Sequence, residues 1–342
     1  MLSEKKIIEI REELETCKRP LFFFHDDPDG VASFLLFYRF VGEGKGVIIK
    51  SHPNVSEMFV RKVEEYNPDK IFILDIAMVE QEFIDAVKVP VVWVDHHEPQ
   101  KRNNVKYFNP RIEGNDNHPV SYVCYKVVQQ DLWISMLGCV GDWFIPDFVD
   151  EFKKSYPDLL PKEITQPDEA LFGSRLGKLI KVVAFMLKGT TQQAMKCVKI
   201  MTRIKTPYEI LNKETPAGKF IYNKFEDING IYEELMDEIK KIVKEDKVLV
   251  YTYKHARYSF TKDISNELLY LFPEKIIIIA REKSGEMRMS LRSKHINIPK
   301  ILDKALIDIE GYGGGHEHAC GACVKVEDFE YFINSIRDSI SK

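Results

Sequence analysis

Length, composition and charge limit what this chain can be. It has 342 residues, of which 44% are hydrophobic and 30% are charged, as in a soluble globular protein with room for two domains. Its net charge of −4 argues against a protein that coats long duplex DNA, because such proteins usually carry a basic surplus. We find no membrane-spanning stretch, no signal peptide and only scattered cysteines, and therefore expect a cytoplasmic protein with reduced thiols.

The first half of the chain alternates apolar strands with helices. The pattern predicts strands at 21–24, 47–50, 70–75 and 89–97, separated by helices at 31–41, 56–66 and 81–87. Continuous apolar strands that alternate with helices are typical of a parallel, doubly wound sheet. A helical stretch at 121–137 follows, and the proline-containing segment 145–180 is expected to be irregular.

Three of these predicted strands end in residue types that bind metals. They are His25, Asp27 and Asp29 after the first strand, Asp75 after the third, and Asp95, His96 and His97 after the fourth. The carboxyl ends of parallel strands meet at one edge of a sheet, and a buried carboxylate is costly unless it is paired or binds a metal. An acidic turn capping a helix would explain the first cluster alone, but not all three. Mixed His and Asp ligands suit Mn²⁺ better than Mg²⁺.

The second half predicts a helical connection and a smaller α/β domain. We expect a catalytic domain at 1–180, helices at 181–246 and a substrate-binding domain at 247–342. In the last part, strands are predicted at 248–253, 275–280, 286–293 and 324–326, with helices at 263–271, 298–307 and 327–341. The fold class is therefore α/β, with an N-terminal doubly wound, mostly parallel sheet joined by helices to the smaller domain.

In this order, the motifs resemble those of the DHH phosphoesterase superfamily, in the branch with a C-terminal DHH-associated domain. The matching elements are His25-x-Asp27-x-Asp29-Gly30, Asp75, Asp95-His96-His97, Gly141-Asp142, Ser290-x-Arg292-Ser293 and Gly313-Gly314-Gly315-His316-x-x-Ala319-x-Gly321. One spacing departs from the bacterial nanoRNases and cyclic-dinucleotide enzymes, because His25 stands two residues before Asp27 instead of four. The compact form is similar to RecJ and the minimal two-domain archaeal nucleases.

The resemblance implies a role for each of these residues. Two Mn²⁺ ions are expected, with Mg²⁺ or Co²⁺ as possible substitutes. One ion would be held by His25, Asp27 and Asp75, and the other by Asp29, Asp75, His96 and Asp142. Asp95 would orient His96, and His97 would face the phosphate. Substrate would bind in the second domain at Ser290, Arg292, Gly313, Gly314, Gly315 and His316, with the glycines as an anion nest or, alternatively, as a simple tight turn.

The implied activity is metal-dependent hydrolysis of short single-stranded RNA or DNA to 5′-mononucleotides, by in-line attack of water between two Mn²⁺ ions. Two alternatives stay open. One is a phosphatase or phosphodiesterase for a small nucleotide, such as 3′-phosphoadenosine 5′-phosphate or a cyclic dinucleotide. The other is a non-catalytic scaffold of the replicative helicase. The expected partner is single-stranded nucleic acid or a short oligonucleotide and not a membrane, while a homodimer and a helicase or replication partner remain open.

Overall fold

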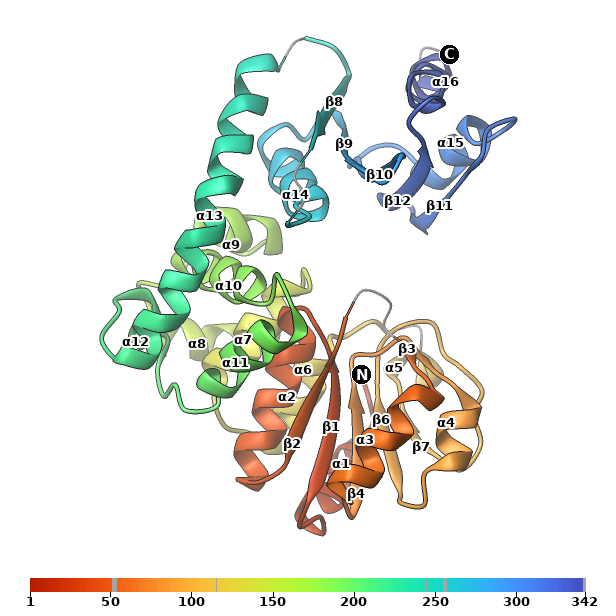
Figure 1. Ribbon diagram of the computed structural model, residues 1–342. Helices are drawn as coiled ribbons and strands as arrows, with labels where there is room; N and C mark the ends of the chain where they lie inside the picture. Colours follow the sequence, from red (N-terminus) through yellow and green to blue (C-terminus); the bar gives the residue numbers. More distant parts are fainter. Residues whose placement is uncertain (51–53, 115, 244, 255–256, 341–342) are drawn as a thin grey trace. The chain divides into compact units, whose positions relative to one another are not determined.

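The computed structural model describes residues 1–50, 54–114, 116–243, 245–254 and 257–340. The chain forms two compact units, Met1–Glu226 and Asp227–Lys342, each with a sheet covered by helices (Figure 1). The predicted α/β class is confirmed, with a mostly parallel first sheet and a smaller second domain. The units divide at residue 226, and the domain boundaries drawn at 180 and 246 stay predictions.

The sheet of the first unit has five parallel strands in the order β2-β1-β4-β6-β7. The strands are β1 (Pro20–His25), β2 (Lys45–Ile49), β4 (Lys70–Leu74), β6 (Val91–Val94) and β7 (Lys106–Phe108), and β3 (Asn54–Val55) pairs separately with β5 (Met78–Val79). The chain runs from β1 to β2, which pairs with one edge of β1, and then returns to β4, which pairs with the other edge. Open α/β sheets bind ligands at such a switch point, beyond the carboxyl ends of the strands.

Helices cover both faces of this sheet because β1 is apolar on both sides. Phe24 stacks on Phe34 of α2 (Pro28–Val41), with ring centroids 4.5 Å apart. Phe23 points to the opposite face and contacts Phe83 of α4 (Gln81–Ala86). The remaining helices of the first unit are α1 (Glu4–Glu15), η1 (Glu57–Phe59), α3 (Val60–Tyr66), α5 (Pro110–Glu113), α6 (Val120–Val128), α7 (Leu132–Gly141), α8 (Val149–Ser155), α9 (Pro167–Gly173), α10 (Arg175–Met186), α11 (Thr191–Met201) and α12 (Pro207–Leu211). Helix α13 (Pro216–Ile242) crosses the division between the two units at residue 226.

Two predicted segments differ from the structure. The helical stretch 121–137 is divided into α6 and α7, because Gln129 and Asp131 adopt left-handed backbone angles between them. The segment 145–180, expected to be irregular, contains α8, α9 and the start of α10. Pro167 does not break a helix there. It occupies the first turn of α9, where a backbone N–H would have no partner within the helix, so the N–H that proline lacks is not needed.

The second unit has a mixed sheet in the order β11-β12-β10-β9-β8. Its strands are β8 (Val248–Tyr253), β9 (Ile276–Lys283), β10 (Glu286–Arg292), β11 (Gly311–His316) and β12 (Ala319–Lys325), and only the β8–β9 pair is parallel. Helix α14 (Thr261–Leu271) packs on β9 and β10. Helices α15 (Ile298–Ala305) and α16 (Phe329–Ile340) cover the other face, where Met289, Leu302 and Phe332 share one apolar core.

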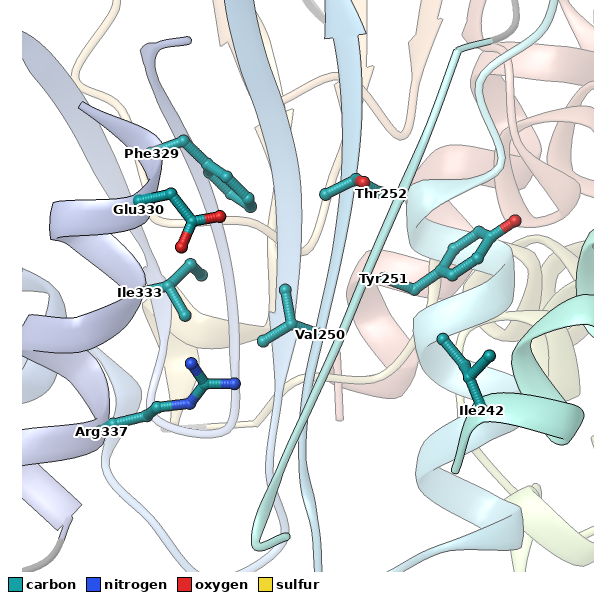
Figure 2. Close-up of a pocket in the computed structure, with 8 residues that line it drawn as sticks. All are labelled: Ile242, Val250, Tyr251, Thr252, Phe329, Glu330, Ile333 and Arg337. Carbon is teal, nitrogen blue, oxygen red and sulfur yellow. The ribbon is translucent and has the colours of Figure 1, made fainter. Parts of the chain in front are cut away.

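A hollow of about 360 Å³ lies on the α16 face of this sheet (Figure 2). It is lined by Ile242, Val250, Tyr251, Thr252, Phe329, Glu330, Ile333 and Arg337. None of the predicted substrate-binding residues belongs to this lining. The six cysteines are free and buried, and no described helix is long and apolar enough to cross a membrane.

Candidate metal and substrate sites

The switch point of the first sheet brings His25 and Asp75 together. His25 is the last residue of β1, and Asp75 directly follows β4, the strand paired with β1. The Asp75 backbone is left-handed, with φ of 56°, and its N–H donates to the Val94 carbonyl at 3.0 Å. Asp and Asn tolerate this conformation better than other side chains. The chain thus turns sharply at the strand end, with the carboxylate buried at 1% exposure.

The first candidate ligand group is His25, Asp27 and Asp75. Nδ1 of His25 lies 3.1 Å from Asp27 Oδ2 and 3.4 Å from Asp75 Oδ2. Asp27 also caps α2, because its side chain accepts from the Gly30 N–H at 3.0 Å. A Cβ on Gly30 would stand 2.5 Å from the His25 carbonyl oxygen, so only glycine allows α2 to begin this close to the end of β1.

The second candidate group is Asp29, His96 and Asp142, and a third group, Asp75, His96 and His97, overlaps both. Nε2 of His96 lies 3.4 Å from Asp75 Oδ1, and its Nδ1 lies 3.7 Å from Asp142 Oδ2. Asp75 therefore reaches both groups, one through each carboxylate oxygen. Asp142 follows α7, which packs so closely that a Cβ on Gly141 would stand 2.7 Å from Pro28.

Asp29 is held by the start of α6 as well as by its neighbours in the group. Its oxygens accept from the Val120 N–H at 2.8 Å, the Ser121 N–H at 2.9 Å and the Ser121 hydroxyl. An anionic side chain is stabilised at a helix N-terminus, where backbone N–H groups lack partners within the helix. The sequence does not reveal Ser121 as a partner, because it lies ninety-two positions away along the chain.

The structure differs from the prediction for Asp95, which contacts His97 and not His96. Asp95 Oδ1 lies 2.7 Å from His97 Nδ1, while Oδ2 accepts from the His97 N–H at 3.1 Å. The reason is local, because the two bonds close a compact turn around His97, whereas His96 is directed toward Asp75. The side chain of His97 is 36% exposed, so its ring faces outward from this buried anchor.

Two residues that belong to none of the sequence motifs support Asp95. The fully buried Asn109 donates through Nδ2 to the His97 carbonyl at 2.9 Å and to the Tyr107 hydroxyl at 2.8 Å, and Nδ2 lies 3.4 Å from Asp95 Oδ2. The Tyr107 hydroxyl donates to Asp95 at 3.3 Å, and its ring stacks on Trp93 at 4.0 Å. The pair Asn109-Pro110 is a recognisable helix-start signal, but it does not predict the other hydrogen bonds of the Asn109 side chain.

The electrostatics of the two groups call for a cation. Burial raises the pKa of Asp29 well above its usual range, and the charges of Asp75 and Asp142 add to the effect. Burial opposes protonation of His96, but Asp75, Asp142 and Asp29 outweigh it and raise the pKa of His96 to about 10. The ion pairs of Asp75 are with His25, His96 and His97.

The donor set therefore fits divalent ions. Nδ1 of His96 is buried and makes no hydrogen bond within the described part of the chain. Without a metal, imidazolium protons must balance the carboxylates, whereas a divalent ion would neutralise them and take the neutral imidazoles as ligands.

Arg292 is the main polar feature of the second unit. Its Nε donates to Asn266 Oδ1 of α14 at 2.7 Å, and its Nη1 donates to the carbonyls of Leu291 and Cys320 at 2.8 and 3.2 Å. Burial lowers the pKa of the guanidinium to about 10, and no carboxylate of the described residues pairs with it. A largely buried cation fixed by neutral groups suits an anion such as phosphate.

The other predicted substrate residues lie on β10 and β11, which both pair with β12. Ser290 is on β10, and His316 ends β11, opposite Ala319 of β12. Gly313, Gly314 and Gly315 do not form a nest or a tight turn, because they pair with β12 as an extended strand, and only Gly315 has positive φ. The side of β11 that carries His316 is exposed, so these residues present an open edge of the sheet.

Comparisons with known proteins identify the family of the chain. The model of the DHH family N-terminal domain matches residues 21–140, and the DHHA1 domain model matches residues 245–342, which together exceed half of the chain. The chain therefore belongs to the DHH phosphoesterase superfamily, whose members are metal-dependent hydrolases. No curated protein sequence matches the chain.

Three solved structures show the same fold at low sequence identity. RecJ from Thermus thermophilus in complex with Mn²⁺ has a TM-score of 0.66 and 13% identity, over 98% of this chain and 54% of that one. The chain thus spans about half of that RecJ. Exonuclease RecJ bound to manganese has a TM-score of 0.58 and 15% identity, over 99% and 94%. A pGpG-specific phosphodiesterase, PggH from Vibrio cholerae, has a TM-score of 0.50 and 12% identity, over 95% and 98%.

Proposed function

We propose that this protein is a Mn²⁺-dependent phosphodiesterase that hydrolyses short single-stranded RNA or DNA to 5′-mononucleotides. The observation that carries the proposal is the set of overlapping ligand groups that are joined through Asp75 and His96 at the switch point of the parallel sheet. Buried carboxylates whose partners are imidazoles are a costly arrangement that a structural role would not require. The likeness to manganese-bound RecJ and to a dinucleotide phosphodiesterase supports both the metal and the substrate class.

Each candidate site residue of the first unit has a defined task in this proposal. His25, Asp27 and Asp75 would hold one ion, and Asp29, Asp75, His96 and Asp142 the other. Two ions held in this way would supply the Lewis acidity and the activated water of an in-line displacement. Asp95 holds the ring of His97 and, after the opposing effect of burial, raises the pKa of this imidazole. A protonated His97 would donate from Nε2 to a phosphate oxygen of the substrate.

Arg292 supports a division of labour between the two units. Its charge lies on a sheet that contributes no residue to any of the ligand groups. It would bind a substrate phosphate, with Ser290, His316 and the exposed β11 glycines beside it. A substrate with several phosphates and little bulk fits a chain of net charge −4, which has no general attraction for long polyanions.

The test is a time course on end-labelled RNA and DNA of graded length with Mn²⁺, in parallel with 3′-phosphoadenosine 5′-phosphate and cyclic dinucleotides. We expect stepwise release of mononucleotides, complete loss in excess EDTA, and loss of several orders of magnitude in Asp75→Asn. Asparagine keeps the left-handed backbone accessible at this position. Full activity in EDTA, or of Asp75→Asn, would exclude the site, and selective hydrolysis of a small nucleotide would exclude the substrate class.

A further inference from the structure

The face of the second sheet opposite α15 and α16 carries α14 on β9 and β10, and it continues beyond Arg292 onto β12 and β11. Alternate residues of β10 (Met287, Met289, Leu291) and of β12 (Cys320, Ala322, Val324) belong to the apolar core on the α15 side. The residues between them therefore point to the opposite face. On β11, a Cβ on Gly311 or Gly313 would meet Leu306 or Leu302, at the α15 side, so Tyr312, Gly314 and His316 also lie on the opposite face.

Strand register arranges this face in three successive rows. The inner row is Arg292, Ala319 and His316, and the middle row is Ser290, Gly321 and Gly314. The outer row is Arg288, Cys323 and Tyr312, which pair directly across β10, β12 and β11. These three strands lie side by side in Figure 1. The outer row thus repeats the combination of the inner one, an arginine on β10 and a ring on β11.

In the middle row, Gly314 and Gly321 form a bare floor, and the fold itself does not require glycine at either position. Gly314 and Gly321 are extended, without positive φ. A Cβ on Gly314 would meet no atom within 4 Å, and one on Gly321 would meet only the Met289 carbonyl, at 3.8 Å. Alanine would therefore fit both positions within the chain. The absence of side chains instead leaves open space between the two rows, bordered by the buried Ser290.

The outer row offers the two contacts that single-stranded nucleic acid uses. Tyr312 is 67% exposed, so most of its ring is open to solvent. Arg288 is half exposed, and its guanidinium is paired through Nε and Nη2 to Glu286 of the same strand. Such an exposed pair contributes little to stability, so a phosphate can compete for the arginine at small cost. Aromatic rings beside cations bind bases and backbone without sequence readout.

The spacing of the rows exceeds one nucleotide. Arg288 and Arg292 are four residues apart on one strand, about 14 Å at a rise of about 3.4 Å per residue. That is about four base steps in a stacked strand, which rises about 3.4 Å per nucleotide, and fewer steps in a stretched one. A mononucleotide at Arg292 would not reach Tyr312, whereas an oligonucleotide lying across the bare floor would.

We propose that the outer row is a second nucleotide subsite, in which Tyr312 stacks on a base and Arg288 binds the adjoining phosphodiester of a strand anchored at Arg292. The inference rests on the proposed function and defines its substrate further. The subsite favours oligonucleotides over mononucleotides and over small phosphorylated nucleosides, because only a chain of nucleotides occupies both rows.

The test measures binding of 5′-phosphorylated oligoadenylates of one to four nucleotides to the full chain in EDTA, so that the ligand is not hydrolysed. Tyr312→Ala and Arg288→Ala should each weaken binding of the tetranucleotide about tenfold, within the range of one base stack, and leave AMP binding unchanged. Tyr312→Phe and Arg288→Lys should each retain most of the affinity, because the ring and the charge remain. The matched control is Tyr331→Ala, which removes an exposed tyrosine from α16 and should change nothing.

Hydrolysis by the wild-type protein with Mn²⁺ is measured in parallel, so that the two proposals fail separately. Wild-type affinity of Tyr312→Ala and Arg288→Ala for the tetranucleotide, with hydrolysis intact, would exclude the second subsite alone. Equal losses for AMP and the tetranucleotide would also exclude it, because the outer row would then act on the inner one. A wild-type protein that neither binds nor hydrolyses any oligonucleotide would overturn the proposed function, and this inference with it.

Discussion

Asn109→Ala should weaken the first unit and slow turnover without removing metal. The side chain donates from its two N–H groups, at 2.8 Å to Tyr107 and at 2.9 Å to the His97 carbonyl. Its Oδ1 also accepts from the Arg111 N–H at 2.9 Å and caps α5. At about 1 kcal/mol for each of two hydrogen bonds and about 1 kcal/mol for the cap, the free energy of unfolding should fall by about 3 kcal/mol.

Urea unfolding followed by tryptophan fluorescence measures this change selectively. The three tryptophans, Trp93, Trp133 and Trp143, all lie in the first unit, so the signal reports the unit that contains Asn109. Turnover should fall about tenfold, because His97 loses part of the anchor that orients its ring, while Mn²⁺ stoichiometry stays at the wild-type value.

Two further variants make the result interpretable. Asn103→Ala, in an exposed loop of the same unit, should change the free energy of unfolding by less than about 0.5 kcal/mol. Tyr107→Phe keeps the stack on Trp93 and removes only the hydroxyl, so it serves if Asn109→Ala does not fold. Unfolding and turnover of Asn109→Ala equal to those of Asn103→Ala would refute the role assigned to this network.

Two other outcomes follow from the charges. Arg292→Ala should raise KM for a short oligonucleotide by at least tenfold, because a charge-assisted phosphate contact is worth about 1.5–3 kcal/mol, and should keep its Mn²⁺ content; loss of metal, or an unchanged KM, would contradict the division of labour. Mn²⁺ affinity should rise with pH between 6 and 8, by about tenfold per unit for each displaced proton, because the raised pKa values of His25 and His96 keep both imidazoles protonated in the metal-free protein. Titration calorimetry in buffers of different ionisation enthalpy would detect the released protons, and a pH-independent affinity would count against metal binding by these imidazoles.

The strand ends could be predicted from sequence because their signal is local. Apolar runs that stop at His25, Asp75 and Asp95 mark both the strand and its end, and parallel pairing then brings these ends to one edge. The direction in which each side chain leaves the strand is not local. The contact of Asp95 with His97 depends on a turn and on Asn109, which no periodicity reveals.

The glycine-rich segment differs from the predicted nest or turn for a different physical reason. Consecutive glycines predict a turn when the backbone needs positive φ, yet Gly313 and Gly314 are extended. Their place in β11 is fixed by pairing with Ala322 and Gly321, so the partner strand overrides the intrinsic preference. The left-handed Asp75 is the opposite case, where an aspartate takes a conformation that sequence would assign to glycine.

The attachment of Asp29 to α6 bears on how such a site decays over evolutionary time. Asp142 lies at the end of α7 with its side chain 35% exposed, whereas Asp29 is 1% exposed and joins α2 to the first turn of α6. A lineage that abandoned hydrolysis would thus lose Asp142 early and Asp29 late, because replacing Asp29 leaves buried N–H groups without an acceptor. Retention of Asp29 in a relative would then report an intact helix junction, and Asp142 would be the better marker of a working enzyme.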